Sequence, residues 1–408
     1  MSEPMDPQEA LQPPEPEEEP TGGNVFREIT GVGSRLRAAL LVPILALVTA
    51  LLVGGFIIAV SDADLLKLWG DDPGKAFTDS LALVGRSYKA LFDGSVGSAN
   101  AVSETLFAAT PLILAGLAVA VGFQAGLFNI GGEGQMLIGG MVGLYIGFTL
   151  SVPAVLHIPL ALIGAVIGGG VWGGISGLLK ARTGAHEVIT TIMLNFIALF
   201  LVDYLLKSSI FQQPGREDPI SKSLDTTAQL PRIFGSSYRV TIGFLIALAA
   251  AAFVYWLLFN SSIGFEFRAV GYNPDAAKYA GMRVVWLYVG VMAVSGALAG
   301  IAGANQIMGL PPYQGSSGFS GQIGFDAIAL ALLGRSHPVG VVWAGLLFGA
   351  LAAGGRQLQG VERIPIDLVV VIQALIIVFI AAPALVRAIY RIKTEGQKTE
   401  QLTRGWAS

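Results

Sequence analysis

The 408-residue chain has no cysteine, only three histidines and few charged residues, which make up 13% of the total. The absence of cysteine excludes disulfides, thiolate metal sites and cysteine nucleophiles. With so few histidines as well, we expect no metal site. A soluble domain has about a quarter of its residues charged. The low charge, the 53% of hydrophobic residues and the mean hydropathy of +0.65 therefore predict an integral membrane protein.

Signatures of catalysis are also missing. The sequence contains no Gly-x-x-x-x-Gly-Lys-Ser/Thr phosphate loop and no Gly-x-Ser-x-Gly nucleophile elbow. His186 and Glu187 begin a pattern similar to the zinc-protease motif, but Thr190 stands where that motif needs its second histidine. We therefore expect a membrane subunit that is not an enzyme.

The two ends of the chain differ from its apolar middle. The first twenty residues hold seven Asp or Glu, six Pro and no Lys or Arg, a composition that cannot bury enough apolar surface to fold. They also lack the charged and apolar regions of a signal peptide. The sequence predicts a disordered acidic tail over 1–25, a transmembrane domain over 26–390 and a cytoplasmic tail over 391–408.

Long apolar runs recur through the middle of the chain, each near the roughly 20 residues that a bilayer requires. The run at 322–334 is short and polar, which predicts a broken or re-entrant element. Pro153, His157 and Pro159 predict a tight turn between two neighbouring runs. We predict ten spans, at about 38–60, 104–123, 136–156, 160–179, 188–206, 241–259, 286–308, 322–334, 338–356 and 365–387.

The distribution of Lys and Arg predicts the orientation of these spans. Basic clusters lie before the first span, after the fourth, between the sixth and seventh, after the eighth and after the tenth. With ten spans and both termini on one side, all five clusters fall on that side. The positive-inside rule makes it the cytoplasmic side, and it leaves the segments 61–103 and 207–240 outside.

The chain also contains an internal echo. Residues 115–140 and residues 299–334 both run from a helix of small residues, through a glycine-rich polar break containing Gly-Gln, into a second apolar helix. By the span count, the first break faces inward and the second faces outward. This pattern predicts an inverted repeat, as in many transporters, although two unrelated glycine-rich loops are an alternative.

The stretch GLFNIGGEGQMLIGG, residues 126–140, places Asn129, Glu133 and Gln135 among glycines at the border of an apolar span. Irregular polar chain at membrane depth must face a protein cavity or water. The three side chains either hold the break together or line a path for a polar solute, and a solvated cytoplasmic loop is the alternative. Asn195, inside a later apolar run, either bonds a neighbouring helix or faces the same path.

Residues 311–335, PPYQGSSGFSGQIGFDAIALALLGR, alternate aromatic and polar side chains. Tyr313, Phe319 and Phe325 with nearby amides would suit a sugar ring or a nucleobase, whereas a belt of interfacial aromatics is the alternative. Asp326 begins the following helix, where it either faces solute or serves only as a cap. The predicted pathway-lining residues are Asn129, Glu133, Gln135, Asn195, Gln322 and Asp326.

Residues 267–284, FRAVGYNPDAAKYAGMRV, predict a short helix with explicit ends. An asparagine cap, a proline at the first position, an acidic residue in the first turn and a glycine at the exit are typical of such helices. It is too short to cross a membrane, and the basic residues around it place it on the cytoplasmic face. There it would dock on another protein or serve as a connector. The predicted contact residues are Asn273, Pro274, Asp275, Ala276, Ala277 and Gly281.

Three segments, GLFNIGGEGQMLIGG, HEVITTIMLN and RAVGYNPDAAKYAGM, occur in this order. Together they resemble the permease subunits of bacterial ATP-binding cassette importers, in the branch shared by branched-chain amino acid, ribose-type sugar and nucleoside permeases. The similarity is greatest to the nucleoside and simple-sugar permeases. It covers about residues 100–390.

The resemblance implies an all-α polytopic fold like that of the cobalamin importers, with about ten transmembrane helices in the bacterial cytoplasmic membrane. It implies a second permease subunit, identical or homologous, and two cytoplasmic ATPase subunits docked on Asn273 to Gly281. An extracytoplasmic solute-binding lipoprotein would deliver the solute, and no nucleic acid is expected. The ATPases would bind the ATP, so this chain would hold no cofactor, and alternating access would carry a nucleoside inward.

Two other interpretations stay open at this point. Within the same class, the solute would be a simple sugar such as ribose, or a branched-chain amino acid. From another class, the chain would be a secondary carrier or channel that works without an ATPase. The few acidic residues within the predicted spans argue against a carrier driven by protons or sodium.

Overall fold

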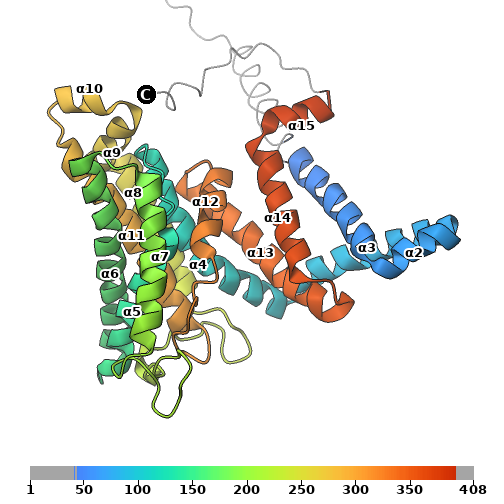
Figure 1. Cartoon of the computed structure of the whole chain (residues 1–408), viewed down its shortest axis with the longest axis horizontal. Helices are drawn as coiled ribbons and strands as arrows, with labels where there is room; N and C mark the ends of the chain where they lie inside the picture. The colour runs from blue at the N-terminus through green and yellow to red at the C-terminus, as the bar shows by residue number, and fades with distance from the viewer. Residues whose placement is uncertain (1–40, 42–43, 392–408) are drawn as a thin grey trace, which may run out of the picture.

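The computed structural model describes residue 41 and residues 44–391, and its regular segments are helices (Figure 1). Within these ranges only three isolated β-bridges occur, and no strand. The predicted tail over 1–25 and all but one residue of the predicted tail over 391–408 lie outside the described residues. The helices are Ile44–Ser61, α2 (Ala63–Asp71), α3 (Pro73–Ser95), α4 (Ala99–Gln124), α5 (Gly132–Thr149), α6 (Ala154–Thr183), α7 (Glu187–Leu206), the 3₁₀ turn η2 (Thr226–Ala228), α8 (Gly243–Asn260), α9 (Ser262–Tyr272), α10 (Pro274–Tyr279), α11 (Val284–Gly309), α12 (Ile323–Leu333), α13 (Pro338–Glu362), α14 (Ile366–Ala381) and α15 (Pro383–Ile389).

Seven of the described helices are long and apolar enough to cross a membrane. Each of them overlaps one of the predicted spans. They support the prediction of a polytopic membrane protein. The seven are Ile44–Ser61, α4, α6, α7, α8, α11 and α13.

The other three predicted spans fall short, so ten crossings are not confirmed. α5 has 18 residues, but its many glycines together with Glu133 and Gln135 make it less apolar. α12 has only 11 residues, in line with the short element predicted at 322–334. The predicted span at 365–387 is divided into α14 and α15. Pro383 begins α15, and a proline lacks the N–H that would continue the preceding helix.

The turn between α5 and α6 lies earlier than predicted. Pro153 is the N-cap of α6, whereas His157 and Pro159 lie inside that helix. The His157 ring is buried, and its nitrogens bond the Thr227 hydroxyl at 2.7 Å and the Ile146 carbonyl at 3.1 Å. Helix-interior proline is tolerated in membrane proteins where neighbouring elements satisfy the freed backbone. The two helices are separate, as predicted, but the separation falls before Pro153.

Small residues allow α6 and α11 to pack with their backbones in contact. A methyl group added at Gly300 would lie 2.2 Å from the carbonyl oxygen of Ala165, and one at Gly296 would lie 2.1 Å from that of Gly169. Neither methyl group would fit unless the backbone moved. Close packing of this kind drives helix association in lipid, where apolar surface gains little by leaving the solvent.

α4 and α11 run in opposite directions. The start of α4 and the end of α11 both contact the loop between α7 and α8. The Ser103 hydroxyl of α4 accepts the N–H of Arg239 at 2.8 Å, and the Met308 carbonyl of α11 accepts the N–H of Leu230 at 2.9 Å. A break and a second helix follow each, with α5 after α4 and α12 after α11. The opposite directions of these two segments are what the predicted inverted repeat requires.

The second helices of the two segments, α5 and α12, meet at their N-termini. A methyl group added at Gly324 would lie 2.3 Å from the backbone nitrogen of Glu133, and one at Gly132 would lie 3.2 Å from the carbonyl oxygen of Gly324. The first turn of a helix carries N–H groups without intrahelical partners and the positive end of the helix dipole. Two such ends therefore converge at one point in the molecule.

A second hydrophobic cluster lies beside the main bundle (Figure 1). It is built from helix Ile44–Ser61, α3 and α14, together with parts of α13. α13 connects it to the bundle, since Gly354 packs against Leu91 of α3 and Gly349 packs against Ala109 of α4. The segment 61–103, predicted to lie outside the membrane, is mostly helical and contains α2 and α3.

Candidate functional site: a cavity where two helices begin

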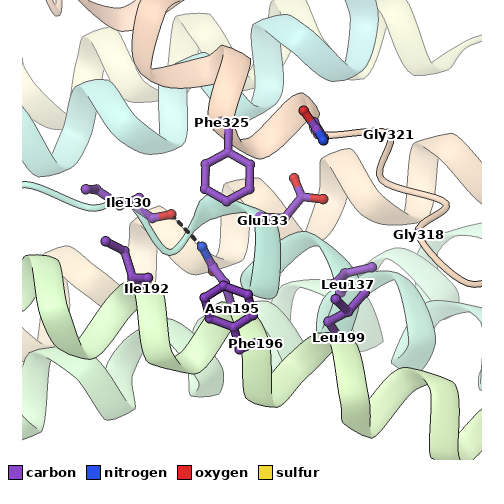
Figure 2. A pocket seen from close by; sticks show the side chains of 11 residues that line it. Ile130, Glu133, Leu137, Ile192, Asn195, Phe196, Leu199, Gly318, Gly321 and Phe325 are labelled. Atoms are coloured by element: carbon purple, nitrogen blue, oxygen red, sulfur yellow. Dashed lines mark hydrogen bonds between the residues drawn. The ribbon is translucent and has the colours of Figure 1, made fainter.

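A cavity of about 740 Å³ lies between the N-terminal turns of α5 and α12 and one face of α7 (Figure 2). Small-molecule sites in proteins have volumes of roughly 300–1,000 Å³, so the cavity can hold a solute. Its lining is mainly apolar, with a few polar side chains that converge on it. The lining residues are Ile130, Glu133, Leu137, Ile192, Asn195, Phe196, Leu199, Gly318, Gly321, Gln322 and Phe325.

The Glu133 carboxylate joins the two helices at this cavity. One oxygen accepts the backbone N–H of Gly324 at 2.9 Å, and the other accepts the hydroxyl of the buried Ser320. Negative charge is stabilised at a helix N-terminus, and here one carboxylate faces the first turn of α12 while it belongs to the first turn of α5. Glu133 thus holds the junction together and remains part of the cavity lining.

Asn195 of α7 satisfies two backbone groups that the break leaves without helical partners. Its side-chain oxygen accepts the N–H of Gly134 at 2.8 Å, and its amide donates to the carbonyl of Ile130 at 2.9 Å (Figure 2). Unsatisfied backbone groups are costly in lipid. Asn195 thus bonds a neighbouring element, as one of its two predicted roles requires, and it also lines the cavity; that it faces a solute path stays a prediction.

Asn129 and Gln135 lie behind the cavity wall and do not line it. Their exposed fractions are 0% and 1%. The Asn129 amide donates to the Ser295 hydroxyl of α11 at 2.7 Å and to the Gln135 side-chain oxygen at 3.0 Å, and the Asn129 oxygen accepts the N–H of Gly131 at 2.9 Å. In this position Asn129 satisfies the broken backbone and Gln135 holds the Asn129 amide in place, and a contact between either one and solute stays a prediction.

Two phenylalanine rings line the cavity, Phe196 from α7 and Phe325 from α12, in the view of Figure 2. Of the aromatics predicted to contact solute in residues 311–335, only Phe325 lies there. Phe319 packs against Gly140, where an added methyl group would lie 2.6 Å from the ring, and Tyr313 joins an apolar cluster. Phe196 was missed by sequence reasoning.

A signal for the α7 face was nevertheless present in the sequence. Ile192, Asn195, Phe196 and Leu199 recur at spacings of three and four residues, which places them on one helix face. Gln322, just before α12, has a φ of 66°, a left-handed conformation that non-glycine residues seldom adopt. Such backbone is often found at functional sites.

Asp326 is separated from the other predicted pathway residues. It lines a second cavity, of about 380 Å³, and not the first. The structure therefore brings Glu133, Asn195 and Gln322 together at one cavity and places Asp326 at another. Among the described residues, no group of three or more His, Asp or Glu side chains could hold a metal ion.

The short helix expected at residues 273–281 is present as α10. Pro274 is its first residue, the Asn273 side chain accepts the N–H of Ala276 at 3.0 Å, and Asp275 lies in the first turn. Gly281 has a φ of 87°, the left-handed exit that was predicted. The ends of α10 therefore follow from local sequence.

The outer surface of α10 is open and aromatic. Tyr279 is 94% exposed, Ala276 is also exposed, and Tyr272, the last residue of α9, is 91% exposed beside them. Ala277, predicted as a contact residue, is only 4% exposed and packs into the main hydrophobic core. Its side chain anchors α10 to the bundle, and docking of another protein on α10 stays a prediction.

Comparison with known proteins places these features in a family. Residues 101–381 match the family described as branched-chain amino acid transport system / permease component. The guanosine ABC transporter permease protein NupP of Bacillus subtilis (strain 168) is 38% identical over 358 residues, which cover 88% of this chain and 97% of that protein. The nucleoside ABC transporter permease protein NupB of Lactococcus lactis subsp. cremoris (strain MG1363) is 36% identical over 349 residues, or 84% of this chain and 90% of that protein.

A third relative is named for a different solute. The glucose ABC transporter permease protein TsgB13 of Haloferax volcanii is 35% identical over 349 residues, which cover 83% of this chain and 86% of that protein. No solved structure matches the chain significantly. The matched stretch includes the helices that line the two cavities, and it also includes α10. The lining helices are α4, α5, α7 and α11 to α14. The chain therefore belongs to the family of multi-pass permease components of ATP-binding cassette transporters to which these proteins are similar.

Proposed function

We propose that this chain is the membrane subunit through which an ATP-binding cassette importer takes up nucleosides. The observation that carries the proposal is the lining of the first cavity. Phe196 and Phe325 offer aromatic faces, and Glu133, Asn195 and Gln322 offer polar groups. A nucleoside presents an aromatic base, which stacks on such rings, and base edges and hydroxyls, which bond amides and carboxylates.

The polar groups keep capacity for a solute after their protein contacts are counted. Each Glu133 oxygen accepts one hydrogen bond, although a carboxylate has about four acceptor sites in all. The Asn195 amide donates one hydrogen and its oxygen accepts one, which leaves a second donor and a second acceptor site. The names of two relatives, guanosine and nucleoside permeases, support the same solute class.

A branched-chain amino acid fits this cavity less well. Its carboxylate would need a cation or a free helix N-terminus. None of the lining residues is Lys or Arg, and Glu133 already faces the N-termini of α5 and α12. A simple sugar is the nearer competitor, because it shares the hydroxyls of a nucleoside and because one relative is named for glucose.

In this proposal the chemistry of ATP belongs to separate subunits. Two cytoplasmic ATPase subunits dock on α10, a second permease completes the membrane part, and an extracytoplasmic lipoprotein delivers the solute. This chain is not an enzyme, holds no cofactor and has both termini in the cytoplasm of a bacterial cell. ATP binding and hydrolysis drive alternating access. The exposed Tyr272, Ala276 and Tyr279 support α10 as the docking element.

Competition during uptake tests the solute. Cells that lack their own nucleoside permeases would express the chain with its ATPase and binding protein and take up radiolabelled guanosine. We expect unlabelled nucleosides to compete and glucose, ribose and leucine to have no effect. An absence of guanosine uptake, while radiolabelled glucose or ribose is accumulated, would replace the nucleoside with a sugar. Uptake that persists without the ATPase would contradict the importer and favour a carrier.

A further inference from the structure

The second cavity lies on the next face of α12. Gln322 and Phe325 line the first cavity, whereas Ile323 and Asp326 line the second. One step along a helix turns the side chain by about 100°, so the two pairs point in different directions. α12 is therefore a wall shared by the two cavities.

Three polar side chains in this second cavity have no protein partner. Asp326, Gln306 of α11 and Gln373 of α14 line it. Within the described part of the chain none of the three side chains takes part in a hydrogen bond or an ion pair. They belong to helices of the membrane domain, where lipid tails could satisfy none of them. Their partner must be water or a polar solute.

The far end of the cavity carries two arginines that share one carboxylate. Arg239 and Arg356 both contact Glu104, at 2.9 and 3.2 Å, and the Arg239 guanidinium lies 4.5 Å from the centre of the Phe107 ring. Each guanidinium has five N–H donors, so most of them remain for another ligand. Arg239 belongs to the loop 207–240, which the sequence places outside the cell. The cavity thus runs from the outer loop to the first turn of α12.

The charged and polar side chains of the second cavity indicate which kind of ligand it binds. Arg239 and Arg356 are balanced by Glu104 and Asp326, which favours a neutral ligand over an ion. An acyl chain would leave Asp326 and the two glutamines unpaired. A solute with hydroxyl and amide groups would bond them, and the Phe107 ring offers it an aromatic neighbour.

We propose that this second cavity is a further solute-binding site, which receives the nucleoside on the outer side of α12 before it reaches the first cavity. The inference rests on the proposed function. Asp326 and Gln373 bind the solute's hydroxyl and amide groups, and Gln306 bonds it from α11. α12 separates the two sites, so the solute must pass this helix to move between them.

The absence of cysteine from the chain makes a direct test possible. Ala352 of α13 lines the second cavity, and Ala352→Cys introduces a single thiol with little change in volume. The complete transporter would be treated with a charged methanethiosulfonate reagent, and modification of this chain would be followed by mass spectrometry with guanosine as the probe. With guanosine at ten times its dissociation constant, occupancy should slow the modification by about tenfold.

Four further substitutions make the result specific. Ala108→Cys offers a second lining position on α4, in case the first variant folds poorly, and Leu199→Cys reports on the first cavity. Ser237→Cys, on the exposed outer loop, should be modified at the same rate with or without guanosine. Gln306→Leu, combined with Ala352→Cys, removes one of the three side chains that bond the solute, so it should weaken the protection at the second cavity and leave that of Leu199→Cys intact.

The outcomes separate this inference from the proposed function. If guanosine protects Leu199→Cys but neither Ala352→Cys nor Ala108→Cys, the second site does not exist and the proposed function stands. Protection of Ala352→Cys that Gln306→Leu leaves unchanged would mean that guanosine acts from a distance, and it would also overturn the site. If none of the three thiols is protected, the second site and the proposed solute fail together.

Discussion

The carboxylate of Glu133 accepts the backbone N–H of Gly324 at 2.9 Å, which ties the first turn of α5 to the first turn of α12 across 191 residues of sequence. Each helix contributes the positive end of its dipole to this contact. Because Glu133 also lines the first cavity, a change in this side chain acts at once on the junction and on the solute.

Removing the charge of Glu133 should slow transport without preventing assembly. Glu133→Gln keeps the volume, but it turns one acceptor into a donor that faces Ser320 or Gly324. A hydrogen bond to a charged group contributes about 1.5–3 kcal/mol, so we expect ATP-dependent guanosine uptake to fall by about tenfold or more. The control is Glu217→Gln in the exposed loop between α7 and α8, and equal uptake by both variants would contradict the role given to Glu133.

Replacing Asn195 should destabilise the chain. Asn195→Leu leaves the N–H of Gly134 and the carbonyl of Ile130 without their partners, at a cost of about 1–3 kcal/mol for each group. We expect a lower midpoint of thermal unfolding in detergent, measured by the loss of helical circular dichroism. Met193→Leu, at an exposed position of the same helix, should leave the midpoint unchanged. A midpoint for Asn195→Leu equal to that of wild type would show that water replaces the lost bonds.

The glycines of α11 should differ sharply in their tolerance of alanine. A methyl group at Gly300 would collide with the carbonyl oxygen of Ala165 at 2.2 Å, whereas one at Gly290 would meet the Phe267 ring at 3.6 Å, an ordinary contact. Gly300→Ala should therefore separate α6 from α11 and lower the yield of folded protein. Gly290→Ala should stabilise the chain slightly, since alanine favours a helix by about 1 kcal/mol over glycine. Similar yields and unfolding midpoints for the two variants would refute the close approach.

A charge on the open face of α10 should block docking of the ATPase. Ala276→Arg places a long cation on an exposed position and leaves the buried Ala277 in place. We expect the ATPase to be lost when the membrane subunit is purified, while the amount of the subunit itself is unchanged. Ser237→Arg, in the exposed loop between α7 and α8, should retain the ATPase. Full recovery of the ATPase with Ala276→Arg would remove α10 from the interface.

Features of the fold that depend only on neighbouring residues in the sequence could be predicted. Seven predicted spans correspond to helices able to cross a membrane, because the length and hydropathy of an apolar segment can be read directly from its sequence. α10 was predicted almost residue by residue, since the effects of Asn273, Pro274 and Gly281 act within a few residues of each. The polar residues at the start of the run 322–334 also predicted that α12 is short.

Contacts between distant segments could not be predicted in this way. Ser295 and Ser320 hold Asn129 and Glu133 in place, yet a serine in an apolar helix or in a glycine-rich loop carries no sign of its partner. The same limit applies to the predicted pathway residues. Sequence alone could not place Asn129 behind the wall or Asp326 in a separate cavity. Nor could it separate α5, whose glycines lower its hydropathy, from the longer spans.

Uptake by purified components tests the central claim most directly. The complete transporter, with its ATPase subunits and binding protein, would be reconstituted in liposomes, and the accumulation of radiolabelled guanosine would be followed with and without ATP. We predict uptake that requires ATP and that Phe325→Ala, which removes a ring from the first cavity, reduces strongly. Guanosine accumulation that needs no ATP, or an absence of guanosine uptake while a sugar is accumulated, would contradict the account.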